Sequence, residues 1–229
     1  MPKPLEAVLF DLDGTLLDTA PDFIGVLRTL LEEQNLPTTL TNAQIRSQVS
    51  HGAAAMVSLG FNMNRQHPQF ESLRLRFLEL YAARLSQSTR LFPGMEELLQ
   101  AIEKQGLPWG IVTNKPLRYA TPLLENLNLS DRCSTLICPE HVQKPKPAPE
   151  PMLLACEQIS CNPHNTVYIG DHRRDIEAGN HANMQTIAVL YGYIDENDPA
   201  ESRKADILVD TVIQLTSWFG QQFAAAPAS

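Results

Sequence analysis

Residues 7–15 read Ala-Val-Leu-Phe-Asp-Leu-Asp-Gly-Thr, an apolar run that stops abruptly at Asp11. Continuous apolar runs of this length are typical of strands that are buried on both faces, as in a parallel sheet. In extended chain, residues two apart point to the same side, so Asp11 and Asp13 share one side while Leu12 points away. Gly14 permits a sharp turn directly after them. The stretch therefore predicts a buried strand that delivers two carboxylates to its carboxyl end.

Apolar runs of the same kind recur in the second half of the chain. They cover residues 109–112, 135–138, 166–169, 186–190 and 207–209. Apolar residues at helical spacing lie between them, for example at 98–102 and 153–156. This alternation predicts an α/β protein with a Rossmann-like parallel sheet and helices on both faces. In such sheets ligands bind at the carboxyl ends of the strands, where Asp11 is expected.

The interval from 18 to 90 breaks this alternation, because it contains no convincing strand. Its helical stretches are expected at 20–34, 41–59 and 68–87. The first is expected to begin near Thr19, with Pro21 in its first turn and Asp22 at the spacing of a capping box. The sequence thus predicts an α/β core that is interrupted by a helical insertion. The expected bounds are 1–17 and 91–229 for the core and 18–90 for the insertion.

The bulk composition limits the possible partners. Of the 229 residues, 43% are apolar and 19% are charged, and the formal net charge is −8. An acidic surface argues against nucleic acid and against an anionic membrane as partners. No apolar run approaches the roughly 20 residues of a membrane span, and the run before Asp11 is too short for a signal peptide. Because the four cysteines form no CxxC pair, reduced thiols are expected. We therefore expect a cytoplasmic protein, either a monomer or a weak homodimer.

Polar residues directly follow two more of the predicted strands. Thr113 and Asn114 offer a hydroxyl and an amide, which are good donors to phosphate oxygens, although they also suit a helix N-cap. Asp171 follows another strand, and Asp175 lies four residues later. If a helix starts in this turn, both carboxylates reach the same place, and carboxylate oxygens suit Mg²⁺. The competing interpretation is a pair of acids that stabilises a helix N-terminus.

A Lys-Pro-Lys-Pro-Ala-Pro run at 144–149 offers the positive charge that an acidic protein needs in order to bind phosphate. The prolines stiffen the segment and hold it extended, so that one ammonium group can be aimed at a fixed point. Both Lys144 and Lys146 begin a Lys-Pro string, so the pattern itself leaves the choice between them open. The competing interpretation is an ordinary basic surface loop.

These four clusters, in this order, resemble the motifs of the haloacid dehalogenase superfamily. The matching residues are Asp11 to Thr15, Thr113, a lysine of the proline-rich run, Gly170, Asp171 and Asp175. The resemblance covers nearly the whole chain, and it identifies the helical insertion with the small cap of the family. By this resemblance the lysine stands six residues before Met152 and the leucine pair that follows it, which favours Lys146 over Lys144.

The resemblance implies a phosphatase that works through an aspartyl-phosphate. Asp11 is then the nucleophile, and Asp13 protonates the leaving alcohol and later deprotonates the attacking water. Thr113, together with Asn114, is expected to hold phosphate oxygens. Lys146 is expected to neutralise charge on Asp11 and on the phosphate. The substrate is expected to be a small phosphorylated metabolite.

The resemblance also implies Mg²⁺ as the cofactor. The expected ligands are Asp11, the backbone carbonyl of Asp13 and Asp171, with Asp175 as a further or water-mediated ligand. Like charges about 4 Å apart repel by roughly 4 kcal/mol at an effective dielectric constant of about 20. Four carboxylates against the single charge of Lys146 would therefore repel a phosphate unless a cation is present. We expect no turnover in the presence of a chelator.

Within the superfamily, the chain resembles the phosphoglycolate phosphatase group. Some segments are more similar still to bacterial N-acetylmuramic acid 6-phosphate phosphatases, which act in peptidoglycan recycling. These segments are 113–116, 136–142, 170–179 and 191–194. The resemblance therefore implies N-acetylmuramic acid 6-phosphate as substrate, with phosphoglycolate as the alternative. Arg46, Ser50, His51 and Gly52 are candidates for cap residues that contact the leaving group, and His172 is a candidate neighbour of the metal.

Three other functions stay open at this point. A dehalogenase shares the fold and the nucleophile, but it has no need of a carboxylate at Asp13. A sugar-phosphate mutase shares all four motifs, and release of free phosphate from a single substrate would exclude it. A phospho-accepting signalling module also combines acids, a threonine and a lysine on an α/β sheet. Such a module is about half this length and lacks the helical insertion.

Overall fold

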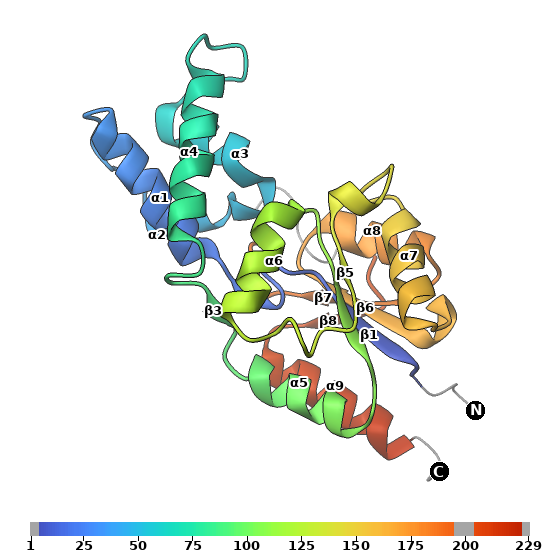
Figure 1. The fold of residues 1–229 in the computed structure, drawn as a ribbon. Helices are drawn as coiled ribbons and strands as arrows, with labels where there is room; N and C mark the ends of the chain where they lie inside the picture. The colour runs from blue at the N-terminus through green and yellow to red at the C-terminus, as the bar shows by residue number, and fades with distance from the viewer. Residues whose placement is uncertain (1–4, 195–203, 226–229) are drawn as a thin grey trace. The chain divides into compact units, whose positions relative to one another are not determined.

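The computed structural model describes residues 5–194 and 204–225, which form two compact units. The first unit, the core, comprises Met1–Leu17 and Leu91–Ser229. The second, the cap, comprises Asp18–Arg90. Figure 1 shows the core strands and the cap helices, coloured along the chain. Within the described residues, no helix has both the length and the apolar character needed to cross a membrane.

The core is built on one parallel sheet, which confirms the predicted α/β fold. Within the described residues the sheet has six strands in the order β5-β4-β1-β6-β7-β8, and neighbouring strands pair in parallel. The strands are β1 (Ala7–Phe10), β4 (Trp109–Val112), β5 (Leu136–Ile137), β6 (Thr166–Gly170), β7 (Gln185–Val189) and β8 (Ile207–Val209). All residues of β1, β4 and β6 are buried, as expected for strands that are covered on both faces.

Helices cover the sheet and share its apolar core. They are α5 (Met95–Lys104), α6 (Leu117–Asn126), α7 (Glu150–Ile159), α8 (Arg173–His181) and α9 (Val212–Ala225), with short 3-10 turns at Pro139–His141 and Pro163–Asn165. Helix α7 packs on β4 and β5, and α8 packs on β6 and β7. Helices α5 and α9 lie side by side (Figure 1). Leu9, Val112 and Tyr168 of the sheet form one buried cluster with Met152 of α7 and Ala178 of α8.

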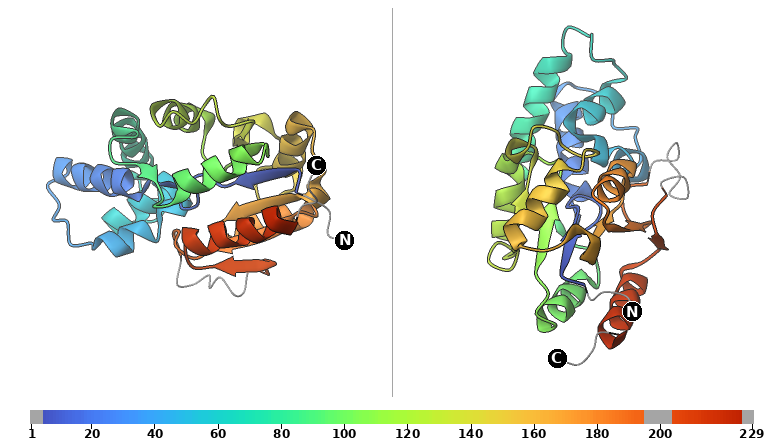
Figure 2. Two further views of the ribbon diagram at one scale, coloured as in Figure 1. Left: turned by 90° about the horizontal axis from the view of Figure 1, so that it is seen from below. Right: turned by 90° about the vertical axis from the view of Figure 1, so that its right-hand side faces the viewer.

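The cap is a small helical bundle. Its helices are α1 (Ala20–Glu33), α2 (Asn42–Arg46), α3 (Gly52–Phe61) and α4 (Phe70–Arg84), with a 3-10 turn at Val49–His51. Helix α1 packs along α4, and α3 contacts both (Figure 2). Aromatic residues join these helices, since the rings of Phe23 and Tyr81 lie 4.5 Å apart between centroids. The strands β2 (Leu17–Asp18) and β3 (Arg90–Leu91) pair where the chain enters and leaves the cap.

Two local predictions for the cap were wrong. Residues 41–59 do not form one helix, because the chain breaks at Gly52, whose φ of 71° lies outside the helical region. Thr19 makes no side-chain cap to α1. The Asp22 carboxylate instead accepts hydrogen bonds from the backbone N–H groups of Ser88 and Thr89, at 2.8 and 3.1 Å. Asp22 therefore joins the two ends of the cap chain instead of completing a capping box.

Strand β1 lies between β4 and β6, so the strand order reverses at its two sides. In open α/β sheets such a switch point leaves a crevice at the carboxyl ends of the strands. The Asp11 N–H continues the β1–β6 ladder by donating to the Ile169 carbonyl at 2.8 Å. Asp11 is thus held by backbone hydrogen bonding at the central point of this edge.

Candidate active site

Asp11 and Lys146 form a buried ion pair at the end of β1. Lys146 Nζ donates to Asp11 Oδ1 at 2.7 Å, and both side chains are almost fully buried. The same ammonium donates to the Val112 carbonyl and to the Tyr168 hydroxyl, each at 2.8 Å. It also lies 2.7 Å from Asp175 Oδ1. A buried charge is tolerated only when it is paired and hydrogen-bonded, and Lys146 meets both conditions.

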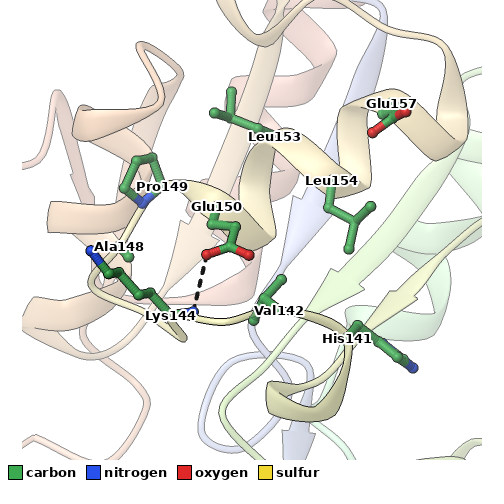
Figure 3. Close-up of a pocket in the computed structure, with 9 residues that line it drawn as sticks. All are labelled: His141, Val142, Lys144, Ala148, Pro149, Glu150, Leu153, Leu154 and Glu157. Carbon is green, nitrogen blue, oxygen red and sulfur yellow. Dashed lines mark hydrogen bonds between the residues drawn. The ribbon is translucent and has the colours of Figure 1, made fainter.

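The other lysine of the proline-rich run lies elsewhere. Lys144 is exposed, and its backbone N–H donates to Glu150 Oε2 at 3.0 Å. Lys144 lines a surface hollow of about 580 Å³ beside α7, together with Val142 and Leu153. Figure 3 draws the residues that line this hollow. None of Asp11, Asp171 or Asp175 lines this hollow. Of the two lysines, it is Lys146 that contacts Asp11.

Three carboxylates gather beside this lysine. Asp11, Asp171 and Asp175 are buried, and each offers one oxygen within 4.8 Å of the others. Burial raises the pKa of Asp11 to about 6, with Lys146 opposing the rise and Asp175 adding to it. Burial, together with Asp11 and Asp175, raises the pKa of Asp171 well above its usual value. Both shifts arise because ionised carboxylates are crowded into a dry site.

A divalent cation would relieve this crowding. Three carboxylate oxygens at such close range are hard ligands of the kind that Mg²⁺ and Ca²⁺ prefer. Although burial works against ionisation of Asp175, Lys146 and Arg174 hold the pKa of this carboxyl below its usual value. We call Asp11, Asp171 and Asp175 the acidic cluster. The chemistry of these residues fits a hard divalent cation.

Asp175 also stabilises the start of α8. Its Oδ2 accepts a hydrogen bond from the His172 N–H at 2.9 Å, and His172 Nδ1 accepts one from the Arg174 N–H at 3.2 Å. His172 and Asp175 form a capping box at the N-terminus of α8. Asp175 therefore stabilises a helix N-terminus, as the competing interpretation of the sequence proposed. These two hydrogen bonds at the start of α8 fix the position of Asp175 beside the acidic cluster. They also engage the Nδ1 atom of His172.

Asp171 is clamped by two segments of the core. Its Oδ1 accepts a hydrogen bond from Thr15 Oγ1 at 3.3 Å, and its Oδ2 accepts one from the Tyr193 N–H at 2.8 Å. Gly192 makes this approach possible, because a methyl group there would overlap both Asp171 Cβ and the Gly14 carbonyl. Such outer contacts orient a metal ligand and are nearly as important as the ligand itself.

We expect Gly192→Ala to lower the affinity of the protein for divalent cations by about 10- to 100-fold, because the added methyl group displaces Asp171. Isothermal titration calorimetry with Mg²⁺ and Mn²⁺ measures the effect. Gly220→Ala on α9 is the matched control, since a methyl group there meets no atom within 4 Å. Unchanged affinity in Gly192→Ala would mean that the clamp does not position Asp171.

Asp13 belongs to a different pair. Lys115 Nζ donates to both of its carboxylate oxygens, at 2.9 and 3.2 Å. The Lys115 side chain is only 5% exposed, whereas that of Asp13 is 17% exposed. Among the described residues, the acidic cluster does not include Asp13. Two carboxylates that stand two positions apart in the sequence thus have two separate lysine partners.

Residues 113–115 link these pairs. Thr113 is buried, and its Oγ1 accepts a hydrogen bond from the Lys115 N–H at 3.1 Å. The side-chain amide of Asn114 forms two hydrogen bonds with the backbone of Lys146. It donates to the Lys146 carbonyl at 2.9 Å and accepts from the Lys146 N–H at 3.1 Å. The side chain of Asn114 thus positions the segment that carries Lys146, and its predicted contact with phosphate stays a prediction.

Sequence reasoning missed two cations of the site. Lys115 stands directly after Thr113 and Asn114, but nothing in its local sequence predicts a role. Arg174 is half-buried, and the charges of Asp175, Asp11 and Asp171 raise its pKa against the effect of burial. Its position between Asp171 and Asp175 in the sequence was the available signal. The carboxylates therefore face more positive charge than Lys146 alone supplies.

The candidate cap residues have their own contacts. Arg46 binds both oxygens of Asp18, at 2.8 and 2.9 Å. His51 lines a hollow of about 610 Å³ within the cap, together with Gln48 and Arg65. Ser50 and Gly52 do not line it. Arg46 is thus tied to the start of the cap, and His51 is the candidate that lines this hollow.

The fold places a buried carboxylate–lysine pair and a cluster of carboxylates at the carboxyl edge of a parallel sheet, where α/β enzymes bind their ligands. The sequence model of the haloacid dehalogenase-like hydrolases matches residues 8–189, and the chain belongs to this family. It is 48% identical to the N-acetylmuramic acid 6-phosphate phosphatase of Pseudomonas putida over 92% of this chain and 94% of that protein.

Other relatives agree on the class. A phosphoglycolate phosphatase of Xanthomonas campestris is 42% identical, covering 91% of this chain and 94% of its own. Among solved structures, a predicted phosphoglycolate phosphatase from Haemophilus somnus superposes with a TM-score of 0.78 at 26% identity, covering 93% of this chain and 98% of that one. The protein is a phosphatase of this family.

Proposed function

We propose that the protein hydrolyses N-acetylmuramic acid 6-phosphate, a reaction of peptidoglycan recycling in the cytoplasm, through an aspartyl-phosphate on Asp11. The buried pair of Asp11 and Lys146 carries the mechanism, because it combines a carboxylate nucleophile with a fixed cation at the switch point of the sheet. The substrate is supported by the 48% identity to the Pseudomonas putida enzyme. The acidic composition favours a small metabolite over nucleic acid or a membrane as partner. The proposed oligomeric state is a monomer or a weak homodimer.

The residues divide the reaction between them. Asp11 attacks phosphorus, and Lys146 lowers the negative charge that would otherwise repel the phosphate. Thr113 lies at the carboxyl end of β4 and binds phosphate oxygens in this scheme. Asp13 protonates the leaving alcohol and then takes a proton from the water that hydrolyses the intermediate. Asn114 acts through Lys146, whose backbone it holds on both sides.

Magnesium is the proposed cofactor. Asp11, Asp171 and the backbone carbonyl of Asp13 would hold it, with Asp175 as a further or water-mediated ligand. When bound, the ion polarises the phosphate oxygens and offsets the charge of the carboxylates. Burial and the neighbouring carboxylates of Asp11 and Asp175 raise the pKa of Asp171 well above its usual value, and this supports the proposal because a bound cation would favour the ionised form.

Phosphate release from a substrate panel tests the function. The panel contains N-acetylmuramic acid 6-phosphate, N-acetylglucosamine 6-phosphate, phosphoglycolate and common sugar phosphates, each with Mg²⁺ and with excess chelator. We expect the highest kcat/KM for N-acetylmuramic acid 6-phosphate and no measurable turnover in chelator. The glucosamine compound is the matched control, since it lacks only the lactyl group.

Each alternative has its own signature in this assay. Preference for phosphoglycolate would replace the proposed substrate, as the 42% identity to the Xanthomonas campestris enzyme allows. An isomerised sugar phosphate without free phosphate would indicate a mutase. A stable phosphoprotein that never turns over would indicate a signalling module. Full activity in chelator would contradict the role of the metal.

A further inference from the structure

The pairing of Asp13 with Lys115 carries an inference about proton transfer. We propose that Lys115 is a positioning residue: its ammonium keeps the Asp13 carboxylate out of the acidic cluster and reserves it for proton transfer to and from the substrate. This inference rests on the proposed function, in which Asp13 is the general acid and base.

The contact itself is strong and specific. Lysine is almost never buried unless it is paired, and the Lys115 side chain is only 5% exposed with its Nζ between the two oxygens of Asp13. Charge-assisted hydrogen bonds of this kind are stronger than neutral ones. The pair joins positions 102 residues apart in the sequence, so the fold and not local chain geometry creates it.

The turn after β4 aims the ammonium. Because Thr113 Oγ1 accepts from the Lys115 N–H, the backbone of Lys115 is fixed beside the strand end. Asn114 fixes the same turn from its other side through Lys146. Each of these three consecutive residues thus has its own contact. Thr113 stabilises the turn, Asn114 holds the backbone of Lys146, and Lys115 binds Asp13.

Asp13 needs such a partner because of its position. It stands only two residues after Asp11 in the sequence, so a carboxylate there is a potential competing ligand for any cation bound by the acidic cluster. An acid-base group must instead be aimed at the reacting oxygen, and misplacement by about 1 Å can cost around 100-fold in rate. Lys146 on Asp11 and Lys115 on Asp13 separate the two carboxylates into different roles.

Single-turnover kinetics of Lys115→Met test the proposal. Release of the leaving group is compared for a sugar phosphate, whose alcohol needs a proton, and for para-nitrophenyl phosphate, whose phenolate does not. We expect the first rate to fall about 10- to 100-fold and the second by less than about threefold, since general acid catalysis contributes about 10²- to 10⁴-fold. In an Asp13→Asn background the same substitution should cost less than about threefold.

Several comparisons make the outcome decisive. Lys115→Arg keeps the charge and should recover most of the rate on the sugar phosphate, and Lys104→Met, at an exposed lysine of α5, should behave as wild type. Mg²⁺ affinity, measured by calorimetry, should not weaken in Lys115→Met. Equal losses on both substrates, or a full additional loss in the Asp13→Asn background, would overturn the proposal. If the wild type itself releases no phosphate, the proposed function fails instead.

Discussion

Asp11→Asn is expected to lower phosphatase turnover by about 10⁴-fold or more, while the protein stays folded. An amide oxygen cannot form the acyl-phosphate, and removal of a covalent nucleophile typically costs this much or more. The structure around Lys146 should persist, because its ammonium keeps Asp175, the Val112 carbonyl and the Tyr168 hydroxyl as partners. Burial raises the pKa of Asp11 to about 6 because it penalises the charged carboxylate, and an uncharged amide at this position avoids that penalty.

A phosphate-release assay measures the predicted loss of turnover, and thermal unfolding measures whether the protein stays folded. The matched control is Asp131→Asn, which makes the same chemical change at an exposed position and should leave both quantities unchanged. A variant that loses activity and also unfolds would leave the role of Asp11 open to a structural explanation. Retention of more than about 1% of wild-type turnover by a well-folded Asp11→Asn protein would remove Asp11 as the nucleophile.

The sheet could be predicted because its signal is local. Each run of apolar residues between polar ones, from 7–10 to 207–209, became a strand of the same parallel sheet. Burial on both faces requires such unbroken runs, and the sequence shows them directly. The strands β2 and β3 were not predicted, because each of them contains a charged residue and neither forms a continuous apolar run like the other strands.

The partners of the charged side chains were harder to predict, because they are set by the tertiary fold. Asp22 was placed by spacing in a capping box, yet it accepts hydrogen bonds from Ser88 and Thr89. Lys115 was visible in the sequence next to Thr113, but nothing local reveals that its ammonium lies on Asp13. Spacing shows which side of a strand or helix a residue occupies, whereas the partner comes from chain that is distant in sequence.

The two lysines of the proline-rich run give the last prediction. Lys146→Met is expected to lower kcat/KM by about 10²- to 10³-fold, the usual effect of removing one preorganised donor to a developing charge. Lys144→Met should stay within about twofold of wild type, because Lys144 is exposed and its neighbours line a surface hollow instead of the acidic cluster. Steady-state kinetics on the preferred substrate measure both variants.

Stability separates the same two variants a second time. Removing Lys146 leaves Asp11 and Asp175 without their shared cation, and loss of one partner of a buried ion pair costs about 3–5 kcal/mol of unfolding free energy. Denaturant unfolding of the metal-free proteins should show this loss for Lys146→Met and a change within about 0.5 kcal/mol for Lys144→Met. Saturating Mg²⁺ should recover part of the loss, since an ion that binds only the folded state stabilises it. If Lys146→Met is as stable and as active as Lys144→Met, then Lys146 does not supply the positive charge that Asp11 needs in order to attack the phosphate.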